Sequence, residues 1–225
     1  MRPYWVTLEG IEGVGKTFLA RLLATRLGGR GLMLSEVTDQ EADALPGQVI
    51  TALSRAGDLW LRTGHPATET LALLALKVRE YESVLASPAM RTEVVIEDRG
   101  VDSVALYQAA ILAGQHASAE QAHALAQRIY ATAAHWRPLP DRTLLIIDDF
   151  DVCVARLEQR TGRAVSAADR ALVRLAAELY AIQAAREPKR FRTVNRADRS
   201  WQETLEEILQ ACSSPPTTEE QRCAT

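Results

Sequence analysis

The stretch Glu9-Gly10-Ile11-Glu12-Gly13-Val14-Gly15-Lys16-Thr17 decides the fold of this chain. From Gly10 it fits a pattern of two glycines separated by four residues and followed by Lys and Thr. A short apolar run rich in β-forming residues, Tyr4 to Leu8, precedes the motif. Apolar residues at helical spacing follow it as far as Leu27, where Gly28-Gly29 ends the run. We therefore expect the motif to be the loop between a strand and a helix.

A glycine-rich loop in that position can bind phosphate. Its backbone N–H groups converge on an anion, the helix dipole adds attraction, and glycines allow close approach. Lys16 can reach the β and γ phosphates of a nucleotide, and Thr17 can offer its hydroxyl to Mg²⁺. The alternative is a turn without a ligand, but the complete pattern with both flanks favours an ATP site. Its expected members are Gly10, Ile11, Glu12, Gly13, Val14, Gly15, Lys16 and Thr17.

The bulk properties exclude several classes of protein. A length of 225 residues suits one α/β domain. The net charge of -3 and a pI near 5.9 give no reason to expect a nucleic-acid polymer as partner. The three cysteines form no CxxC pair, which favours a reducing compartment. No apolar run approaches the roughly 20 residues that span a bilayer, and we see no signal peptide. We expect a cytoplasmic protein that is not held in a membrane.

Four further runs are predicted to be strands, at residues 31–36, 93–97, 143–148 and 191–194. Helical patterns separate them, and this alternation predicts an α/β fold with a five-stranded parallel sheet and helices on both faces. We expect one domain over residues 1–211, a small lid at about 158–168 and a disordered tail over 212–225. On the helix over 67–86, the expected buried face consists of Leu71, Leu74, Val78, Tyr81 and Leu85.

Ligands of such sheets bind outside the carboxyl ends of the strands. This rule brings Glu36, Asp98 and Arg99 toward the loop. Asp98 could hold a metal-bound water, and Arg99 could clamp phosphoryl oxygens in a bidentate manner. The alternative is a surface pair that caps the next helix. Charged residues at strand ends are common, so this motif alone leaves both interpretations open.

Two helical segments carry further candidate residues. Arg156, Arg160 and Arg163 flank Thr161-Gly162, as a lid over a triphosphate requires, although a solvated helix face gives the same pattern. After Arg99, Ser103 and Tyr107 are four residues apart and share a helix face. They could border a base pocket, while core packing of Tyr107 is equally compatible with the pattern.

This arrangement resembles the thymidylate kinases of the P-loop nucleoside monophosphate kinase group. The resemblance rests on Glu9–Thr17, Asp98–Gln108 and Pro140–Asp148, and it covers most of residues 4–211. It implies Mg-ATP-dependent phosphorylation of dTMP, a small nucleotide, usually by a homodimer. By position, Lys16 and Thr17 would hold ATP phosphates and Mg²⁺, Glu12 would face the acceptor sugar, and Arg99 would face its phosphate.

The resemblance also implies a base pocket and a source of catalytic arginines. Residues around the base would be Arg79, Ser103, Tyr107 and Gln108. Gly13 stands where some members carry an arginine. This suggests the subgroup that draws its catalytic arginines from the lid, here Arg160 and Arg163.

The chain departs from the family at the acceptor side. Ser35 to Asp39 replaces the family's Arg-Glu-Pro-Gly-Gly stretch, whose arginine grips the acceptor phosphate, and Leu73 to Leu76 lacks the usual stacking aromatic. Glu36 stands where deoxynucleoside kinases, a related group, keep a general base. A nucleoside kinase or a tailoring kinase for a modified nucleotide, with Glu36 as base, is therefore the alternative. A regulator that binds nucleotide and hydrolyses it slowly is a further one.

Overall fold

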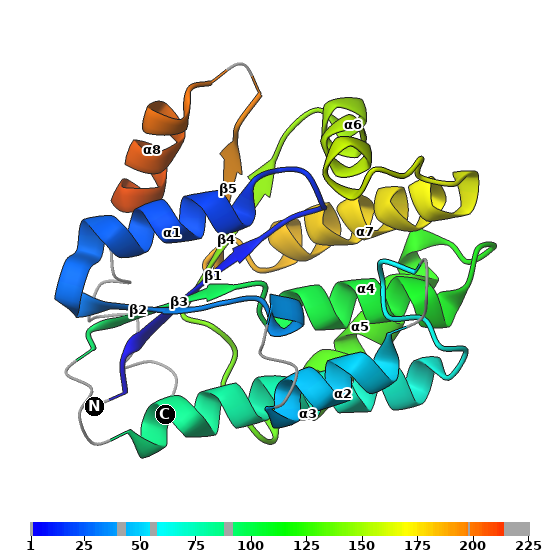
Figure 1. Cartoon of the computed structure of the whole chain (residues 1–225), viewed down its shortest axis with the longest axis horizontal. Coiled ribbons are helices and arrows are strands. Elements are labelled where there is room, and N and C mark those ends of the chain that lie inside the picture. The colour runs from blue at the N-terminus through cyan, green and yellow to red at the C-terminus, as the bar shows by residue number, and fades with distance from the viewer. Residues whose placement is uncertain (1, 40–43, 55–57, 88–91, 198, 214–225) are drawn as a thin grey trace.

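The structure is a computed structural model that describes residues 2–39, 44–54, 58–87, 92–197 and 199–213 (Figure 1). Five strands form one sheet in the order β2-β3-β1-β4-β5, and every neighbouring pair is parallel. The strands are β1 (Tyr4–Glu9), β2 (Gly31–Leu34), β3 (Val94–Asp98), β4 (Arg142–Ile147) and β5 (Phe191–Asn195). The predicted five-stranded parallel sheet is confirmed. Because β1 lies between β3 and β4, the strand order reverses beside the glycine-rich loop, where α/β sheets bind ligands.

Helices cover both faces of the sheet (Figure 1). They are α1 (Lys16–Leu27), α2 (Leu45–Leu53), α3 (Pro66–Ala86), α4 (Val101–Ala113), α5 (Ala119–Ala134), α6 (Phe150–Thr161), α7 (Ala167–Arg186) and α8 (Trp201–Ser213). Helices α1 and α8 contact each other on one face, and α4 lies on the other with α3, α5 and α7 against it. Among the described residues, no helix combines the length and apolarity that crossing a bilayer requires.

The last described element is α8, which continues to Ser213. The first two residues of the tail expected over 212–225 are therefore helical. The rest of that tail lies outside the described residues.

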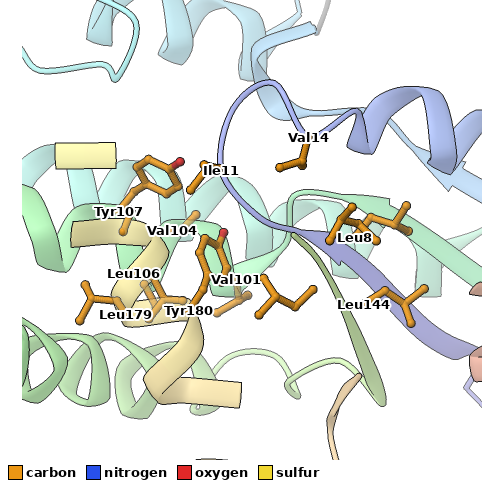
Figure 2. Packing of buried hydrophobic residues seen from close by; sticks show 14 of the residues in the cluster. Leu8, Ile11, Val14, Val101, Val104, Leu106, Tyr107, Leu144, Leu179 and Tyr180 are labelled. Atoms are coloured by element: carbon orange, nitrogen blue, oxygen red, sulfur yellow. The ribbon is translucent and has the colours of Figure 1, made fainter. Parts of the chain in front are cut away.

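The core is continuous from the central strands into α4. Val6, Leu8, Ile96 and Leu144 are completely buried. In α4, the first ten residues, Val101 to Ala110, are all buried. A helix enclosed on every side is held by packing rather than by one apolar stripe. It therefore provides a fixed support for the residues at its N-terminus, which lie beside the loop (Figure 2).

The expected buried face of α3 is only partly right: Leu74 is buried and Val78 and Tyr81 are half-buried, but the other two expected residues are exposed. Leu71 and Leu85 are 61% and 50% exposed. The buried residues of this helix are Glu69, Thr70, Leu73, Leu74, Leu76, Lys77 and Val84. Two of them are charged and are buried because they have partners: Glu69 accepts hydrogen bonds from three backbone N–H groups before the helix, and Lys77 pairs with Glu80 and Glu97. A prediction from apolar residues alone misses these charged residues and therefore assigns a partly wrong face of the helix to the core.

A buried ion cluster joins α3 to the sheet beneath the carboxyl edge. Arg137 and Glu97 are fully buried and form a double contact, with N–O distances of 3.2 and 3.1 Å. Lys77 Nζ lies 3.2 Å from Glu97 Oε1, and the Trp5 indole donates to Oε2 at 2.6 Å. Burial acts to raise the pKa of Glu97, but the charges of Arg137 and Lys77 outweigh it and lower the pKa to about 2.

We expect Arg137→Met to lower the free energy of unfolding at pH 7 by about 3–5 kcal/mol, because it leaves a buried carboxylate with one cation fewer. The Glu97 pKa lies near 2 in the folded chain against an ordinary 4.5. Its stabilisation is therefore present above pH 4.5 and is lost as the pH falls toward 2. Urea unfolding across that window should show a weaker acid dependence in the variant. Arg30→Met, whose side chain is 64% exposed, is the control and should change little. Equal losses in both variants would contradict this role.

Candidate active site

The loop between β1 and α1 turns the side chains of Ile11 and Val14 into the core, and its one other side chain, Glu12, lines a cavity. Ile11 and Val14 are buried, and Figure 2 shows both on the loop, with Ile11 beside Tyr107 of α4. A cavity lies against the loop, which we call the loop cavity. Its lining includes Glu12, Gly13, Gly15, Lys16, Thr17, Phe18, Glu36, Arg99, Arg156 and Arg160. The loop therefore presents backbone and charged groups to one space.

Gly13 has no room for a side chain. Its φ is +84°, and a Cβ there would lie 2.1 Å from the carbonyl oxygen of Cys153 on α6. Gly15, with φ +91°, sits in the left-handed region directly before α1. Such positions favour glycine because other residues meet a steric penalty. The loop's shape thus depends on close packing against α6 and on a sharp entry into α1.

Lys16 is held inside the loop it belongs to. Its Nζ donates to the carbonyl oxygens of Gly10 and Ile11, at 2.8 Å each. Burial, and then the positive charge of Arg99, lower the pKa of Lys16 to about 8. An anionic ligand in the loop cavity would favour the charged amine and oppose both effects.

Asp98, at the end of β3, fits a metal site. Both of its carboxylate oxygens are buried and have no hydrogen-bond partner among the described residues. Burial raises the pKa of Asp98, and the Thr17 side chain and Lys16 oppose that rise. Buried polar atoms without partners are uncommon, and Mg²⁺ accepts one carboxylate together with hydroxyl, water and phosphate oxygens. In the described part of the chain, no three His, Cys, Asp or Glu side chains gather as an all-protein metal cage. The donor set therefore fits a magnesium ion shared with phosphates.

Arg99 stands between two carboxylates. Its guanidinium lies 2.9 Å from Glu12 and 3.0 Å from Glu36, and its Cζ lies 5.7 Å from the centre of the Tyr107 ring. Its φ of +62° is in the left-handed region, a strained backbone that often marks a functional position. The site thus holds this guanidinium in one place, facing both carboxylates.

Glu12 stays ionised in this arrangement. Burial acts to raise its pKa, but Arg99, Lys16 and a hydrogen bond from Tyr107 outweigh burial and lower it. The Tyr107 hydroxyl donates to Glu12 Oε2 at 2.5 Å. Its sequence pattern also allowed Tyr107 to be a simple core residue. In the structure it does more than that, because from α4 it contacts the loop.

A second, mostly apolar cavity begins on the other side of Arg99, and we call it the apolar cavity. Its lining includes Glu12, Glu36, Val37, Thr38, Leu59, Trp60, Leu61, Leu73, Lys77, Arg99, Gly100, Ser103, Val104, Tyr107 and Gln108. Glu12, Glu36 and Arg99 line both cavities. These three charged residues therefore form the junction between the loop cavity and the apolar cavity.

The structure brings most, but not all, of the expected residues to these cavities. Ser103, Tyr107 and Gln108 line the apolar cavity, whereas Arg79 is exposed and is absent from its lining. Lys77 occupies the place on α3 that was assigned to Arg79. Its spacing of four from Leu73 and seven from Thr70, both buried, was the available signal. Trp60, three residues past the undescribed residues 55–57, had no sequence signal at all.

The arginines near the turn between α6 and α7 are divided. Arg156 and Arg160 line the loop cavity, but Arg163 is exposed and belongs to the lining of neither cavity just described. Arg156 donates to Asp148 at 2.6 Å and to the Gly13 carbonyl at 3.3 Å. Of these three arginines, Arg156 is thus the one with a hydrogen bond to the loop, while the expected roles of Arg160 and Arg163 stay predictions.

Beneath the loop, Glu9 links three elements. Its carboxylate accepts from the Gly100 N–H at 2.7 Å, from Ser103 at 2.5 Å and from Tyr180 of α7 at 2.7 Å. Burial first, and then the charge of Asp102, raise the pKa of Glu9 to about 7. Ser103 is therefore shared between the wall of the apolar cavity and this buried network.

Glu9→Gln should abolish a pH dependence of stability. Below pH 4.5 the carboxyl is neutral in both states, and between 4.5 and about 7 only the unfolded chain loses its proton. Stability therefore falls as the pH rises through this window. Gln stays neutral, so the variant should exceed the wild type above pH 7 by an amount on the order of 3 kcal/mol. Urea unfolding at pH 5 and pH 8 measures this. Glu93→Gln, at a 63% exposed side chain, serves as control, and parallel pH profiles for Glu9→Gln and wild type would refute the expectation.

Comparisons with known proteins identify the family. The Thymidylate kinase family model matches residues 8–208. Thymidylate kinase of Cupriavidus taiwanensis is 30% identical over 212 residues, which cover 93% of this chain and 98% of that relative. Thymidylate kinase of Bifidobacterium longum is 30% identical over 195 residues, covering 87% and 90%. The crystal structure of thymidylate kinase from Ehrlichia chaffeensis shares the fold, with a TM-score of 0.64 at 18% identity over 95% of this chain and 100% of that one. The chain belongs to the thymidylate kinase family.

Proposed function

We propose that this chain transfers the γ-phosphoryl group of Mg-ATP to dTMP. The observation that carries the proposal is the junction of Glu12, Glu36 and Arg99 between a phosphate-type cavity and an apolar one. Phosphoryl transfer needs a donor and an acceptor on either side of a fixed positive charge. We choose dTMP as the acceptor because the relatives are named thymidylate kinases.

On the donor side, the loop cavity would take the triphosphate. Lys16 would exchange the carbonyls of Gly10 and Ile11 for phosphate oxygens, and the backbone from Gly13 to Thr17 would supply N–H donors. Thr17 and Asp98 would hold Mg²⁺, which when bound neutralises charge on the transferred group. The chain's own task is to position the donor and to hold positive charge near it.

On the acceptor side, Arg99 would grip the monophosphate, and the apolar cavity would take the base. A monophosphate has a second pKa near 6, so at neutral pH it is already largely anionic and needs no strong base. The cavity opens to solvent, and its lining combines apolar side chains with a few polar groups, as small-molecule sites do. Ser103, Tyr107 and Gln108 are the polar groups on α4 that would fix the base and sugar.

The segment between α6 and α7 would close over the donor. We propose that residues 158–168 act as a lid within a single kinase domain of residues 1–211. The segment contains Gly162, in the left-handed region with φ +66°, and Arg160, which lines the loop cavity. Closure would exclude water and add positive charge at the transferring group. Arg163, exposed here, would reach the site only in that closed state.

We also propose a homodimer and a cytoplasmic location. Support for the dimer is the 61% exposed Leu71 of α3, which borders a hollow shared with Leu74, Leu112 and Leu125 of three helices. An apolar face of this kind is usual at an interface between copies. Support for the location is that Cys153 and Cys212 are free thiols, as in reducing compartments.

One observation keeps a nucleoside kinase as the second candidate. Glu36 lines both cavities, which is where a base for a neutral sugar hydroxyl would have to lie. Against it, the Glu36 carboxylate is engaged by Arg99 at 3.0 Å. A carboxylate paired in this way serves to orient the arginine, which favours the monophosphate acceptor.

Two substitutions should separate the donor and acceptor sides. Lys16→Met should lower kcat by about a hundredfold or more, because a donor to the transferred phosphate is lost. Arg99→Lys should raise KM for dTMP about tenfold with little change in KM for ATP, because Lys cannot replace bidentate contacts. Steady-state ADP release with each substrate varied in turn measures both. An Arg99→Lys variant with a wild-type KM for dTMP would place the acceptor phosphate elsewhere.

Glu36→Gln distinguishes the two acceptor classes. If dTMP is the acceptor, kcat should fall by less than about tenfold, because only the orientation of Arg99 loosens. If a nucleoside is the acceptor, loss of the base should cost about 10²–10⁴-fold. We expect turnover with dTMP and none with thymidine in both proteins. Rapid wild-type turnover of thymidine that Glu36→Gln abolishes would favour the nucleoside kinase.

A further inference from the structure

Backbone strain occurs at two places around the apolar cavity. In the part of the chain that the structure describes, only Leu61 and Arg99 have positive φ without being glycine, at +57° and +62°. Both line the apolar cavity. Strain of this kind persists where the surroundings impose it, and it gathers at ligand sites. Arg99 has a place in the proposed reaction, but Leu61 does not yet have one.

Leu61 belongs to a short segment, residues 58–62, which we call the wall. Leu59, Trp60 and Leu61 line the cavity, facing a space also bounded by Leu73 and Val104. Trp60 is 7% exposed, and its indole N–H has no acceptor among the described residues. An unpaired buried donor beside a strained residue is a cost that purely structural loops seldom keep.

Arg62 fastens the wall at its far end. Its Nε donates to Asp58 Oδ1 at 2.7 Å and its backbone N–H to Oδ2 at 2.5 Å, so the wall is closed on itself. Its Nη2 also donates to Asp169 Oδ1 at 2.7 Å. Asp169 lies in the first turn of α7, whereas Arg160 lies in the last turn of α6, and Asp169 is not among the residues that line the apolar cavity. The wall is thus tied to the helix that follows the proposed lid.

We propose that the wall binds the aromatic base of the acceptor, with Trp60 as its main contact, and that Arg62 positions the wall through Asp58 and Asp169. The inference rests on the proposed function, in which the apolar cavity holds the acceptor base. It supplies an aromatic side chain from the segment before α3, whereas Leu73 to Leu76 within α3 supply none. Base–aromatic stacking tolerates different bases, so the wall provides affinity for a flat ring.

The first test replaces the aromatic contact. Trp60→Leu should raise KM for dTMP about tenfold, and Trp60→Phe should stay within about threefold of wild type, because stacking needs a flat ring. KM for ATP reports whether either variant has lost its fold. Inhibition by 2-deoxyribose 5-phosphate, which lacks a base, should be unchanged in both. Trp136→Leu, at a 69% exposed tryptophan, is the matched control. Equal weakening of dTMP and the baseless sugar phosphate would overturn a role in base binding.

The second test addresses positioning from outside the cavity. Arg62→Met and Asp169→Asn should each raise KM for dTMP about threefold without a matching change in KM for ATP, which is the scale of a partly exposed ion pair. Arg2→Met removes a pair of similar exposure, 35% and 25% against 33% and 21%, and should change neither KM. Wild-type values for both Arg62→Met and Asp169→Asn would remove the positioning role.

Calorimetric titration with dTMP separates this inference from the proposed function. Binding without turnover, weakened about tenfold by Trp60→Leu, would support the wall and refute the kinase activity. Turnover of dTMP with an unchanged KM in Trp60→Leu would support the kinase activity and refute the role of the wall. A wild-type protein that neither binds nor converts dTMP would overturn both.

Discussion

The site depends on one guanidinium held between two carboxylates. Arg99 meets Glu12 from the loop and Glu36 from the end of β2, so three segments distant in sequence converge on one charge. This convergence follows from the sheet: β3 lies between β1 and β2 in parallel register, so their carboxyl ends share one edge. A left-handed backbone at Arg99 then turns the chain from β3 toward α4. Strand order and one strained residue together set the distance between the two cavities.

Two adjacent buried carboxylates on β3 have pKa values that are shifted in opposite directions. Glu97 faces Arg137 and Lys77, which lower its pKa to about 2, whereas burial raises the pKa of Asp98. Successive strand residues point to opposite faces, so neighbours in sequence can occupy unrelated surroundings. One carboxylate is neutralised within the protein and strengthens the scaffold. The next, Asp98, accepts no hydrogen bond within the described part of the chain, at the edge where a cation would supply a partner.

Local signals made the loop and the sheet predictable, and tertiary packing decided the rest. The glycine pattern, the apolar runs and the Asp98-Arg99 pair are each contiguous, so the sequence placed them correctly at one edge. The buried face of α3 could not be predicted from local sequence, because Lys77 is buried only through partners on β3 and within its own helix. An apolar pattern therefore chose Leu71, which is exposed, and assigned Arg79 to a cavity that Lys77 lines. The sequence carries no signal for Trp60, because no periodicity marks a segment between helices.

The contact between Gly13 and α6 limits how such a loop can change over evolutionary time. A Cβ at position 13 would lie 2.1 Å from the Cys153 carbonyl, so no side chain enters while α6 keeps its place. An arginine at this position requires α6 to retreat, and with it Arg156, which contacts the same glycine's carbonyl. The same space can thus hold a positive charge from the loop or one from α6, but not both. A lineage that moves from one to the other must change both elements together.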